Sequence, residues 1–341
     1  MEKPILGITM GDPAGIGPEI AVKVLSRKEI YDICTPIIIG DAGAINDALR
    51  ITRLDLKVNR IKRVASALSA YGTVDLVDLD CVDMSELVYG KVSAMAGNAA
   101  FACVKKVIEM AMSGEIDATV TGPINKESIN LAGHHFSGHT EIYAHFTGTD
   151  NYSMMLAHEN LRVVHVSTHV SLKEACERVK RQRVLDVICL ADSVCKRLGM
   201  PAPKVGVAGL NPHAGECGMF GREEIEEITP AINDAKAMGI TVDGPVPPDS
   251  LFSKARGGWY DIVVAMYHDQ GHIPLKVLGF VWDDGKKIWK AISGVNVTLG
   301  LPIIRSSVDH GTAFGKAGKG TASELSLIHA IEYGVKMAGR N

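Results

Sequence analysis

The sequence lacks the features that mark secreted, membrane-spanning and nucleic-acid-binding proteins. Its seven cysteines are scattered and odd in number and include no Cys-x-x-Cys pair, which argues against a disulfide framework and favours reduced thiols in a cytoplasm. No apolar run is long enough to cross a membrane, and the N-terminus does not have the pattern of a signal peptide. The formal net charge of −3 provides no basic field for nucleic acid. We therefore expect a cytoplasmic protein whose partners include neither nucleic acid nor membrane.

Internal repeats, low-complexity tracts and the common nucleotide-binding motifs are also missing. The glycine-rich segment 11–19 follows a short apolar strand and precedes a helix, an arrangement that can hold an anion through backbone N–H groups. The segment matches neither G-x-G-x-x-G nor the P-loop. From the residues alone, a tight strand-to-helix turn is favoured over an anion site by about two to one.

What the sequence does contain is typical of an α/β protein. Its 341 residues, 46% hydrophobic and 22% charged, are enough for two domains or one large α/β unit. Short apolar runs at residues 5–10, 36–40 and 118–121 predict buried strands, and the periodicity of residues 93–112 predicts a long helix.

Three histidines follow predicted strands. Residues 262–266 predict a strand buried on both faces, whose carboxyl end leads to His268 before Gly271 lets the backbone turn. His169 and His213 come after two earlier strands in the same way. Ligands of open α/β sheets bind beyond the carboxyl ends of strands, so these imidazoles could converge on one divalent metal ion. From the residues alone, ordinary core or surface positions for these histidines remain an equal alternative to a metal site.

Such a site would carry Lewis-acid chemistry. Three neutral imidazoles suit zinc, cobalt, nickel or manganese and leave coordination positions for a substrate hydroxyl and carbonyl oxygen. Lys276, Asn296 and Arg305 could hold a phosphate or carboxylate, although single lysines and arginines are usually solvated. His139 and Thr140 open a predicted helix and suit an anionic or hydroxylated ligand, the alternative being helix capping by Thr140.

Several blocks of sequence resemble the PdxA family, 4-hydroxythreonine-4-phosphate dehydrogenase and its relatives. The blocks follow the family order along the chain and comprise residues 7–19, 121–126, 137–141, 168–169, 209–216, 267–271, 294–302 and 305–313. The resemblance implies a divalent metal ion (Zn, Mg, Co or Mn) bound by His169, His213 and His268 and shared across a homodimer. It implies substrate contacts from His139, Thr140, Lys276, Asn296 and Arg305. Asp249 corresponds to a family aspartate near the metal, and with Lys276 it is assigned a catalytic role.

The resemblance also implies a fold and a cofactor. The family fold is similar to that of isocitrate and isopropylmalate dehydrogenases, a two-domain α/β/α sandwich with the active-site cleft between the domains. Residues 1–130 and 300–341 would form the NAD-side domain, and residues 131–299 the metal, substrate and dimerisation domain. NAD would lie at a loop that includes His310, Gly311, Thr312, Ala313 and Ala322. The sequence leaves NAD and NADP both open.

An insertion separates this chain from the pyridoxine-pathway enzymes of the family. Residues 281–293 replace a much shorter connection, which makes the chain resemble the D-threonate or D-erythronate 4-phosphate dehydrogenase branch, with dihydroxyacetone phosphate as product. The alternative within the family is 4-phosphohydroxy-L-threonine dehydrogenase of pyridoxal phosphate biosynthesis. Two further hypotheses come from other classes, namely a non-catalytic sugar-phosphate sensor and a metallohydrolase that uses the three histidines.

Overall fold

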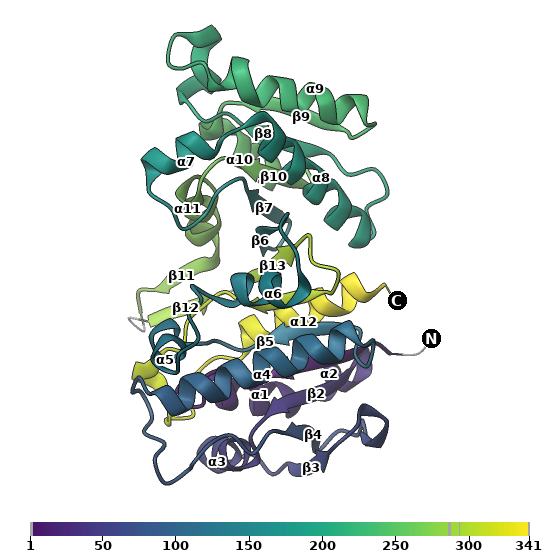
Figure 1. Ribbon diagram of the computed structural model, residues 1–341, viewed down its shortest axis with the longest axis vertical. Coiled ribbons are helices and arrows are strands. Elements are labelled where there is room, and N and C mark those ends of the chain that lie inside the picture. Colours follow the sequence, from purple (N-terminus) through teal and green to yellow (C-terminus); the bar gives the residue numbers. More distant parts are fainter. Residues whose placement is uncertain (1–2, 286–287, 293, 340–341) are drawn as a thin grey trace. The chain divides into compact units, whose positions relative to one another are not determined.

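The computed structural model describes residues 3–285, 288–292 and 294–339. The chain forms two compact units: unit 1 comprises Met1–Asp150 and Leu301–Asn341, and unit 2 comprises Asn151–Gly300. In each unit, helices pack on strands (Figure 1), which confirms the predicted α/β class. The sequence places the first boundary near residue 130, whereas helix α6 (His139–Thr147) packs on α4 (Ala94–Met112) and therefore falls in unit 1.

Unit 1 is built on a parallel sheet. Its strand order is β3-β4-β2-β1-β5-β14, with parallel pairing between neighbours. The strands are β1 (Ile5–Thr9), β2 (Thr35–Gly40), β3 (Lys57–Ile61), β4 (Thr73–Asp78), β5 (Ala118–Thr121) and β14 (Arg305–Val308). The other helices are α1 (Gly17–Leu25), α2 (Lys28–Ile33), α3 (Ala42–Thr52), α5 (Lys126–Leu131) and α12 (Leu325–Ala338).

Strand β1 shows why these strands are apolar on both sides. A side chain at Gly334 of α12 would meet Leu6, whereas a side chain at Gly7 would meet Val107 of α4. Successive residues of a strand point to opposite faces, so α12 and α4 cover the two faces of the sheet. Both faces are therefore buried, and the strand has no polar alternation.

Unit 2 combines parallel and antiparallel strands in the order β13-β6-β7-β10-β8-β9. β6 pairs antiparallel with β7, and β10 lies parallel to both β7 and β8. The strands are β6 (Ser153–His158), β7 (Leu161–His165), β8 (Val205–Ala208), β9 (Val242–Val246), β10 (Ile262–Ala265) and β13 (Val295–Leu299). The helices are α7 (Leu172–Arg178), α8 (Arg181–Arg197), α9 (Thr229–Ala237), α10 (Pro248–Arg256) and α11 (His268–Gly279).

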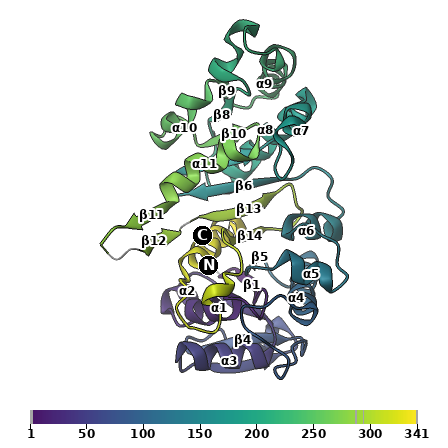
Figure 2. The ribbon, with the colours of Figure 1, turned by 90° about the vertical axis from the view of Figure 1, so that its left-hand side faces the viewer.

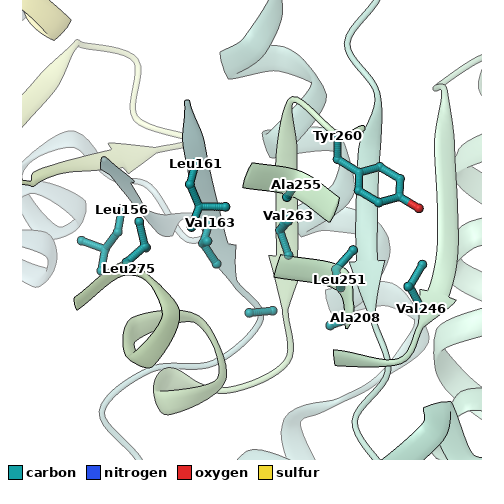
Figure 3. Packing of buried hydrophobic residues seen from close by; sticks show 11 residues of the cluster. Leu156, Leu161, Val163, Ala208, Val246, Leu251, Ala255, Tyr260, Val263 and Leu275 are labelled. Atoms are coloured by element: carbon teal, nitrogen blue, oxygen red, sulfur yellow. The ribbon is translucent and has the colours of Figure 1, made fainter. Parts of the chain in front are cut away.

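Helices α10 and α11 cover one face of this sheet. Leu251 of α10 and Leu275 of α11 join Val163 and Val263 in one buried cluster (Figure 3). Burial of each such side chain contributes about 1.5–3 kcal/mol. This packing holds α11, which begins at His268, against the sheet.

The chain at α11 differs from the sequence prediction. Gly271 was expected to end the strand in a turn, but His268–Gly279 is a helix that includes both Gly271 and Pro274. Glycine and proline disfavour helix interiors by about 1 and 3 kcal/mol. Tertiary contacts of the helix oppose this local preference, among them the burial of Leu275 and the two hydrogen bonds of Gln270.

The inserted segment is a hairpin. Strand β11 (Phe280–Asp283) pairs antiparallel with β12 (Ile288–Ile292), as the sequence predicts around Asp284 and Gly285. Figure 2 shows β11 continuing from α11 and β12 leading on towards β13. Residues 286, 287 and 293 of the insertion lie outside the described part of the chain. No helix in the described ranges combines the length and the apolarity that crossing a membrane requires.

A buried aspartate joins two neighbouring loops of unit 1. Asp12 follows β1 and is fully buried; its backbone N–H donates to the Pro123 carbonyl at 2.8 Å, and its Oδ1 accepts from the Ala14 N–H at 2.8 Å. Burial raises the pKa of Asp12 to about 6. Desolvation penalises the charged carboxylate, so the folded protein keeps this proton to a higher pH than the unfolded chain does.

The raised pKa of Asp12 predicts a pH-dependent stability. Between the ordinary aspartate pKa of 3.8, which applies to the unfolded chain, and the folded value of about 6, the folded state holds a proton that the unfolded state has released. The contribution is therefore complete below about pH 4 and disappears as the pH rises through 6. Asp12→Asn should remove it, so that the variant gains up to about 3 kcal/mol relative to wild type between pH 4 and 7. Urea unfolding across this range measures the difference, and a difference independent of pH would contradict the assignment.

Close packing between α4 and α5 predicts a second stability effect. A Cβ on Gly97 would lie 2.0 Å from the Ser128 carbonyl oxygen, a backbone atom that has little freedom to move. Gly97→Ala should destabilise unit 1 by about 2 kcal/mol, because overpacking outweighs the better helix propensity of alanine. Gly315→Ala is the matched control, since no atom lies within 4 Å of the added Cβ. Thermal unfolding of both variants tests the prediction, and equal stability would refute it.

Candidate functional site

The carboxyl ends of three parallel strands in unit 2 are held in register. Val264 of β10 pairs with Val164 of β7 on one side and with Val207 of β8 on the other. Hydrogen bonds tie the loops that follow: the Val166 N–H donates to the Ala265 carbonyl at 2.8 Å, and Ser167 Oγ donates to the Met266 carbonyl at 3.0 Å. The segments that carry His169 and His268 are thereby brought side by side, as the sequence predicts.

Gln270 ties the third strand end to this pair. Its buried amide accepts from the Met266 N–H at 2.6 Å through Oε1 and donates to the Gly209 carbonyl at 2.8 Å through Nε2. Gly209 follows β8 and begins the loop towards His213. One side chain thus holds the ends of β10 and β8 together.

A pocket of about 310 Å³ lies at the ends of β7 and β10. The ring centres of His169 and His268 are 5.7 Å apart. Two imidazoles bound to one ion through bonds of about 2.0–2.1 Å hold their ring centres about 5 Å apart, close to this spacing. The pocket is lined by Ser167, Thr168, His169, Val170, Leu172, Ala175, Tyr267, His268 and Asp269.

His268 has the hydrogen bonding of a metal-binding histidine. Its Nδ1 lies 2.7 Å from Asp269 Oδ1. The carboxylate only accepts, so Nδ1 carries the proton and Nε2 keeps a lone pair. A carboxylate on the far nitrogen fixes the tautomer and raises the basicity of the ligand.

The two predicted metal ligands that lie in loops, His169 and His213, have a strained backbone. His169 has φ 29° and His213 has φ 53°, in the left-handed region that residues with a Cβ rarely occupy. His213 belongs to a run of five left-handed residues, which continues through Ala214, Gly215, Glu216 and Cys217. Each non-glycine residue there costs about 1–2 kcal/mol, and strain of this kind gathers at functional sites.

Glu224 anchors the strained run at its start. The buried carboxylate accepts from the Leu210 and Asn211 N–H groups, both at 2.7 Å, and from Asn211 Nδ2 at 2.9 Å. Glu224 begins a π-helical turn, Glu224–Ile228, that leads into α9. The π-turn leaves the Glu224 carboxylate facing the loop.

The histidine site within one chain is incomplete. Among the described residues, no group of three His, Cys, Asp or Glu side chains is placed to hold a metal ion. The structure brings His169 and His268 together, and it places His213 beside Phe220, with ring centres 6.4 Å apart. Neutral imidazole nitrogens fit a zinc-like ion, so His169 and His268 are suitable ligands for such a metal. The role of His213 as a third ligand stays a prediction.

The other predicted residues of unit 2 occupy different elements. Lys276 lies two helical turns beyond His268 on α11, and residues spaced by four share one helix face. Asn296 of β13 donates to Met154 Sδ at 2.9 Å. Asp249 is in the first turn of α10 and is exposed. Their part in substrate binding or catalysis stays a prediction.

Unit 1 contains a buried cation beside a buried imidazole nitrogen. Arg305, at the start of β14, is 3% exposed; it donates to Thr121 Oγ1 at 3.1 Å and lies over the ring of Tyr143. Burial lowers the pKa of Arg305 to about 10, so it stays charged at neutral pH. Burial, and then the charge of Arg305, keep the pKa of His139 well below its usual range. His139 Nε2 is buried without a hydrogen-bond partner among the residues that the structure describes. A cation and a polar nitrogen in this environment suit a phosphate or carboxylate.

Helix α6 begins at His139 itself, after Gly138 at the N-cap position. Thr140 is the second helical residue, so it does not cap the helix, which was the alternative to ligand binding. His139 and Thr140 lie in the first helical turn, where backbone N–H groups have no helical acceptor. This environment suits the anionic or hydroxylated ligand that the sequence predicts.

The predicted cofactor loop is fastened to α1. Buried Glu19 accepts from the N–H groups of Gly318 and Gly320 at 2.6 and 2.7 Å, and Lys23 Nζ donates to the carbonyls of Gly320 and Ala322. The Ile16 N–H donates to the Thr312 carbonyl at 3.0 Å. The glycine-rich segment 11–19 thus serves as a close-packed turn that receives another loop, the alternative that the residues favour.

Within this loop, His310 Nδ1 lies 2.9 Å from the Gly311 carbonyl, and Thr312 is buried. Ala313 has φ 44°, another strained backbone position. One loop, held by these hydrogen bonds, therefore carries all the residues predicted to bind NAD: His310, Gly311, Thr312, Ala313 and Ala322. The binding of NAD by this loop stays a prediction.

The sequence analysis does not single out three residues that have unusual environments, namely His165, His272 and Asp12. Burial lowers the pKa of His165 to about 3, and the charge of neighbouring His272 is the next cause. Burial raises the pKa of Asp12 to about 6. The sequence signal for His272 is its spacing of four from His268, which carries meaning only once residues 268–279 are known to be helical.

The comparisons with known proteins agree with the sequence blocks. Residues 32–334 match the family described as pyridoxal phosphate biosynthetic protein PdxA. A protein of Symbiobacterium thermophilum with the provisional name D-threonate 4-phosphate dehydrogenase is 48% identical, over 98% of this chain and 97% of its own. The solved structure of a 4-hydroxythreonine-4-phosphate dehydrogenase from Burkholderia phymatum is 44% identical over 99% of each chain, with a TM-score of 0.85. Another such dehydrogenase, from Klebsiella pneumoniae, is 42% identical over 98% of each chain, with a TM-score of 0.87.

The family match covers most of the chain, and the relatives match it over nearly their whole length. The family match, residues 32–334, includes the blocks from residue 121 to residue 313, and the Symbiobacterium and Burkholderia relatives are matched over 98% and 99% of this chain. We conclude that this chain belongs to the PdxA family.

Proposed function

We propose that this PdxA-family member is an oxidoreductase that acts on a CH–OH group. In the proposed reaction it oxidises and decarboxylates D-threonate or D-erythronate 4-phosphate to dihydroxyacetone phosphate. The observation that carries the proposal is the placement of His169 and His268 beside one pocket, at the aligned ends of β7 and β10. The name of the Symbiobacterium relative supports the choice of a threonate phosphate.

The proposed reaction removes a hydride and a proton from the substrate and then releases CO₂. The carbon at position 3 of the substrate gives up a hydride, and its hydroxyl gives up a proton, which leaves a β-keto acid. The bond to the carboxyl carbon then breaks, CO₂ departs, and carbon 2 takes up a proton. When bound, a divalent metal ion polarises the hydroxyl and carbonyl oxygens, and NAD accepts the hydride.

In unit 2, the proposal assigns metal binding to His169, His213 and His268 through neutral ring nitrogens. The Asp269 carboxylate keeps the proton of His268 on Nδ1, so Nε2 is the ligand atom. We assign the two proton transfers to Asp249 and Lys276; the position of Lys276 on the His268 face of α11 supports its part.

In unit 1, the proposal assigns anion binding to Arg305, His139 and Thr140. The buried guanidinium can grip a phosphate or carboxylate with two parallel hydrogen bonds, which a lysine would not reproduce. Asn296 is also assigned to substrate binding. The loop of His310–Ala313 and Ala322 is assigned to NAD, and its attachment to Glu19 and Lys23 supports a preformed binding loop.

We also propose that a second copy of the chain completes the metal site in a homodimer. The incomplete set of ligands among the described residues of one chain supports this. Met219 and Phe220, on the loop of His213, are 74% and 49% exposed, and exposed apolar side chains beside a ligand favour a protein contact there.

A second candidate reaction is the oxidation of 4-phosphohydroxy-L-threonine. The names of the Burkholderia and Klebsiella dehydrogenases favour it. The two substrates share the phosphate, the hydroxyl at carbon 3 and the carboxylate, and differ in a hydroxyl or an amino group at carbon 2. Residues that contact carbon 2 therefore decide between them.

We expect NADH formation when the protein is given D-threonate or D-erythronate 4-phosphate, NAD and a divalent metal ion. The assay compares these acids with 4-phosphohydroxy-L-threonine, each with NAD and NADP, after chelation and reconstitution with Zn, Mg, Co or Mn. One CO₂ and one dihydroxyacetone phosphate should form per NADH. Phosphate release without a nicotinamide cofactor would indicate a hydrolase, and tight binding without turnover across the panel would indicate a sensor.

His268→Ala should abolish turnover and metal retention together, because it removes the ligand whose tautomer Asp269 fixes. Metal content after gel filtration and NADH formation measure the two effects. His329→Ala, which removes an imidazole from α12 of unit 1, is the matched control and should keep both. A His268→Ala enzyme that works without metal would defeat the proposed mechanism.

A further inference from the structure

Two more histidines form a bent row with His268. The rings of His268 and His272 are stacked, with centres 3.6 Å apart and planes 12° from parallel. The ring centre of His165 lies 4.8 Å from that of His272 and 6.5 Å from that of His268, so the row bends at His272 and His165 lies at the edge of the His272 ring. His165 is on β7 and is 1% exposed, so the row runs from the pocket into the core of unit 2.

Hydrogen bonds to groups that only accept fix the tautomers of this row. His272 Nδ1 lies 2.9 Å from the backbone carbonyl of His268, and His165 Nδ1 lies 3.2 Å from that of Met154. A carbonyl oxygen accepts, so both Nδ1 atoms carry the proton, as His268 Nδ1 does towards Asp269. Each ring is thus held at one nitrogen, and His272 is held to the backbone of the residue it stacks on.

Gly271 makes the close approach possible. A Cβ at this position would lie 2.4 Å from His165 Nε2 and 2.7 Å from Val163 Cγ1. Only a residue without a side chain lets the first turn of α11 come this close to β7. The glycine therefore serves the contact between helix and strand that supports the histidine row.

His268 needs this support because its own side chain is 38% exposed, and its partner Asp269 is 69% exposed. The outer torsion of a histidine is broad, so one exposed hydrogen bond leaves the ring free to rotate. A flat partner on one face restricts that rotation. Replacing a group that orients a ligand without touching the metal typically lowers the metal affinity by about 10–100-fold.

We propose that His272, whose ring edge lies beside His165, is a positioning residue that holds the ring of His268 in the orientation needed for metal binding. This inference rests on the proposed metal-dependent function, and it adds a residue that binds neither metal nor substrate. The spacing of four places His272 one helical turn beyond His268, on the same face of α11.

The test compares Co²⁺ binding to chelated and reconstituted wild-type protein with binding to His272→Ala and His272→Phe. We expect His272→Ala to weaken binding about tenfold or more and to change the visible absorption of bound Co²⁺. His272→Phe keeps a flat ring against His268 and should recover most of the affinity. His329→Ala is the matched control for removal of an imidazole and should match wild type. Thermal unfolding of each variant separates a loss of fold from a loss of ligand orientation.

Wild-type affinity and an unchanged Co²⁺ spectrum in His272→Ala would overturn the positioning role. So would a His272→Phe protein as weak as His272→Ala, because the flat face would then be irrelevant. If wild type itself binds no Co²⁺, the proposed function fails, and the crystal structure of His272→Ala then decides the positioning role. An unrotated His268 ring in that structure would reject it.

Discussion

The parallel register of β7, β10 and β8 is the constraint on which the candidate site depends. Val264 is paired on both sides, so the residues that leave these strands emerge at one edge of the sheet of unit 2. His169, His213 and His268 are far apart along the chain, and each follows one of these strands. Gln270 and the backbone hydrogen bond from Val166 then tie the loops across that edge.

The site is held by buried polar groups as much as by packing. Glu224 holds the loop of His213, Glu19 holds the loop after Thr312, and Asp12 joins the loops after β1 and β5. Each of these acidic residues accepts from backbone N–H groups that are buried or partly buried. A buried N–H group left without a partner would cost about 1–3 kcal/mol. In this chain, acidic residues next to glycine-rich loops therefore fix backbone geometry.

The sequence predicted the strands and their polar ends because burial on both faces leaves an unmistakable apolar run, as in residues 262–266. It did not predict α11, since Gly271 and Pro274 oppose a helix locally and only tertiary contacts, such as that of Leu275 with the core, favour it. The histidine row was missed for the same reason: His272 faces His268 only on a helix, and His165 reaches His272 only through tertiary packing. The raised pKa of Asp12 likewise comes from burial that no local pattern encodes.

The left-handed run at His213 has a consequence for attempts to make this protein more robust. Glycine at Ala214, Glu216 or Cys217 would relieve unfavourable φ values, so these are sites where engineered thermostability could be gained. The same replacement at His213 would relieve the backbone equally and delete the imidazole. Fold and chemistry thus make opposite demands on one residue, and a screen that selects only for heat resistance would tend to erase it.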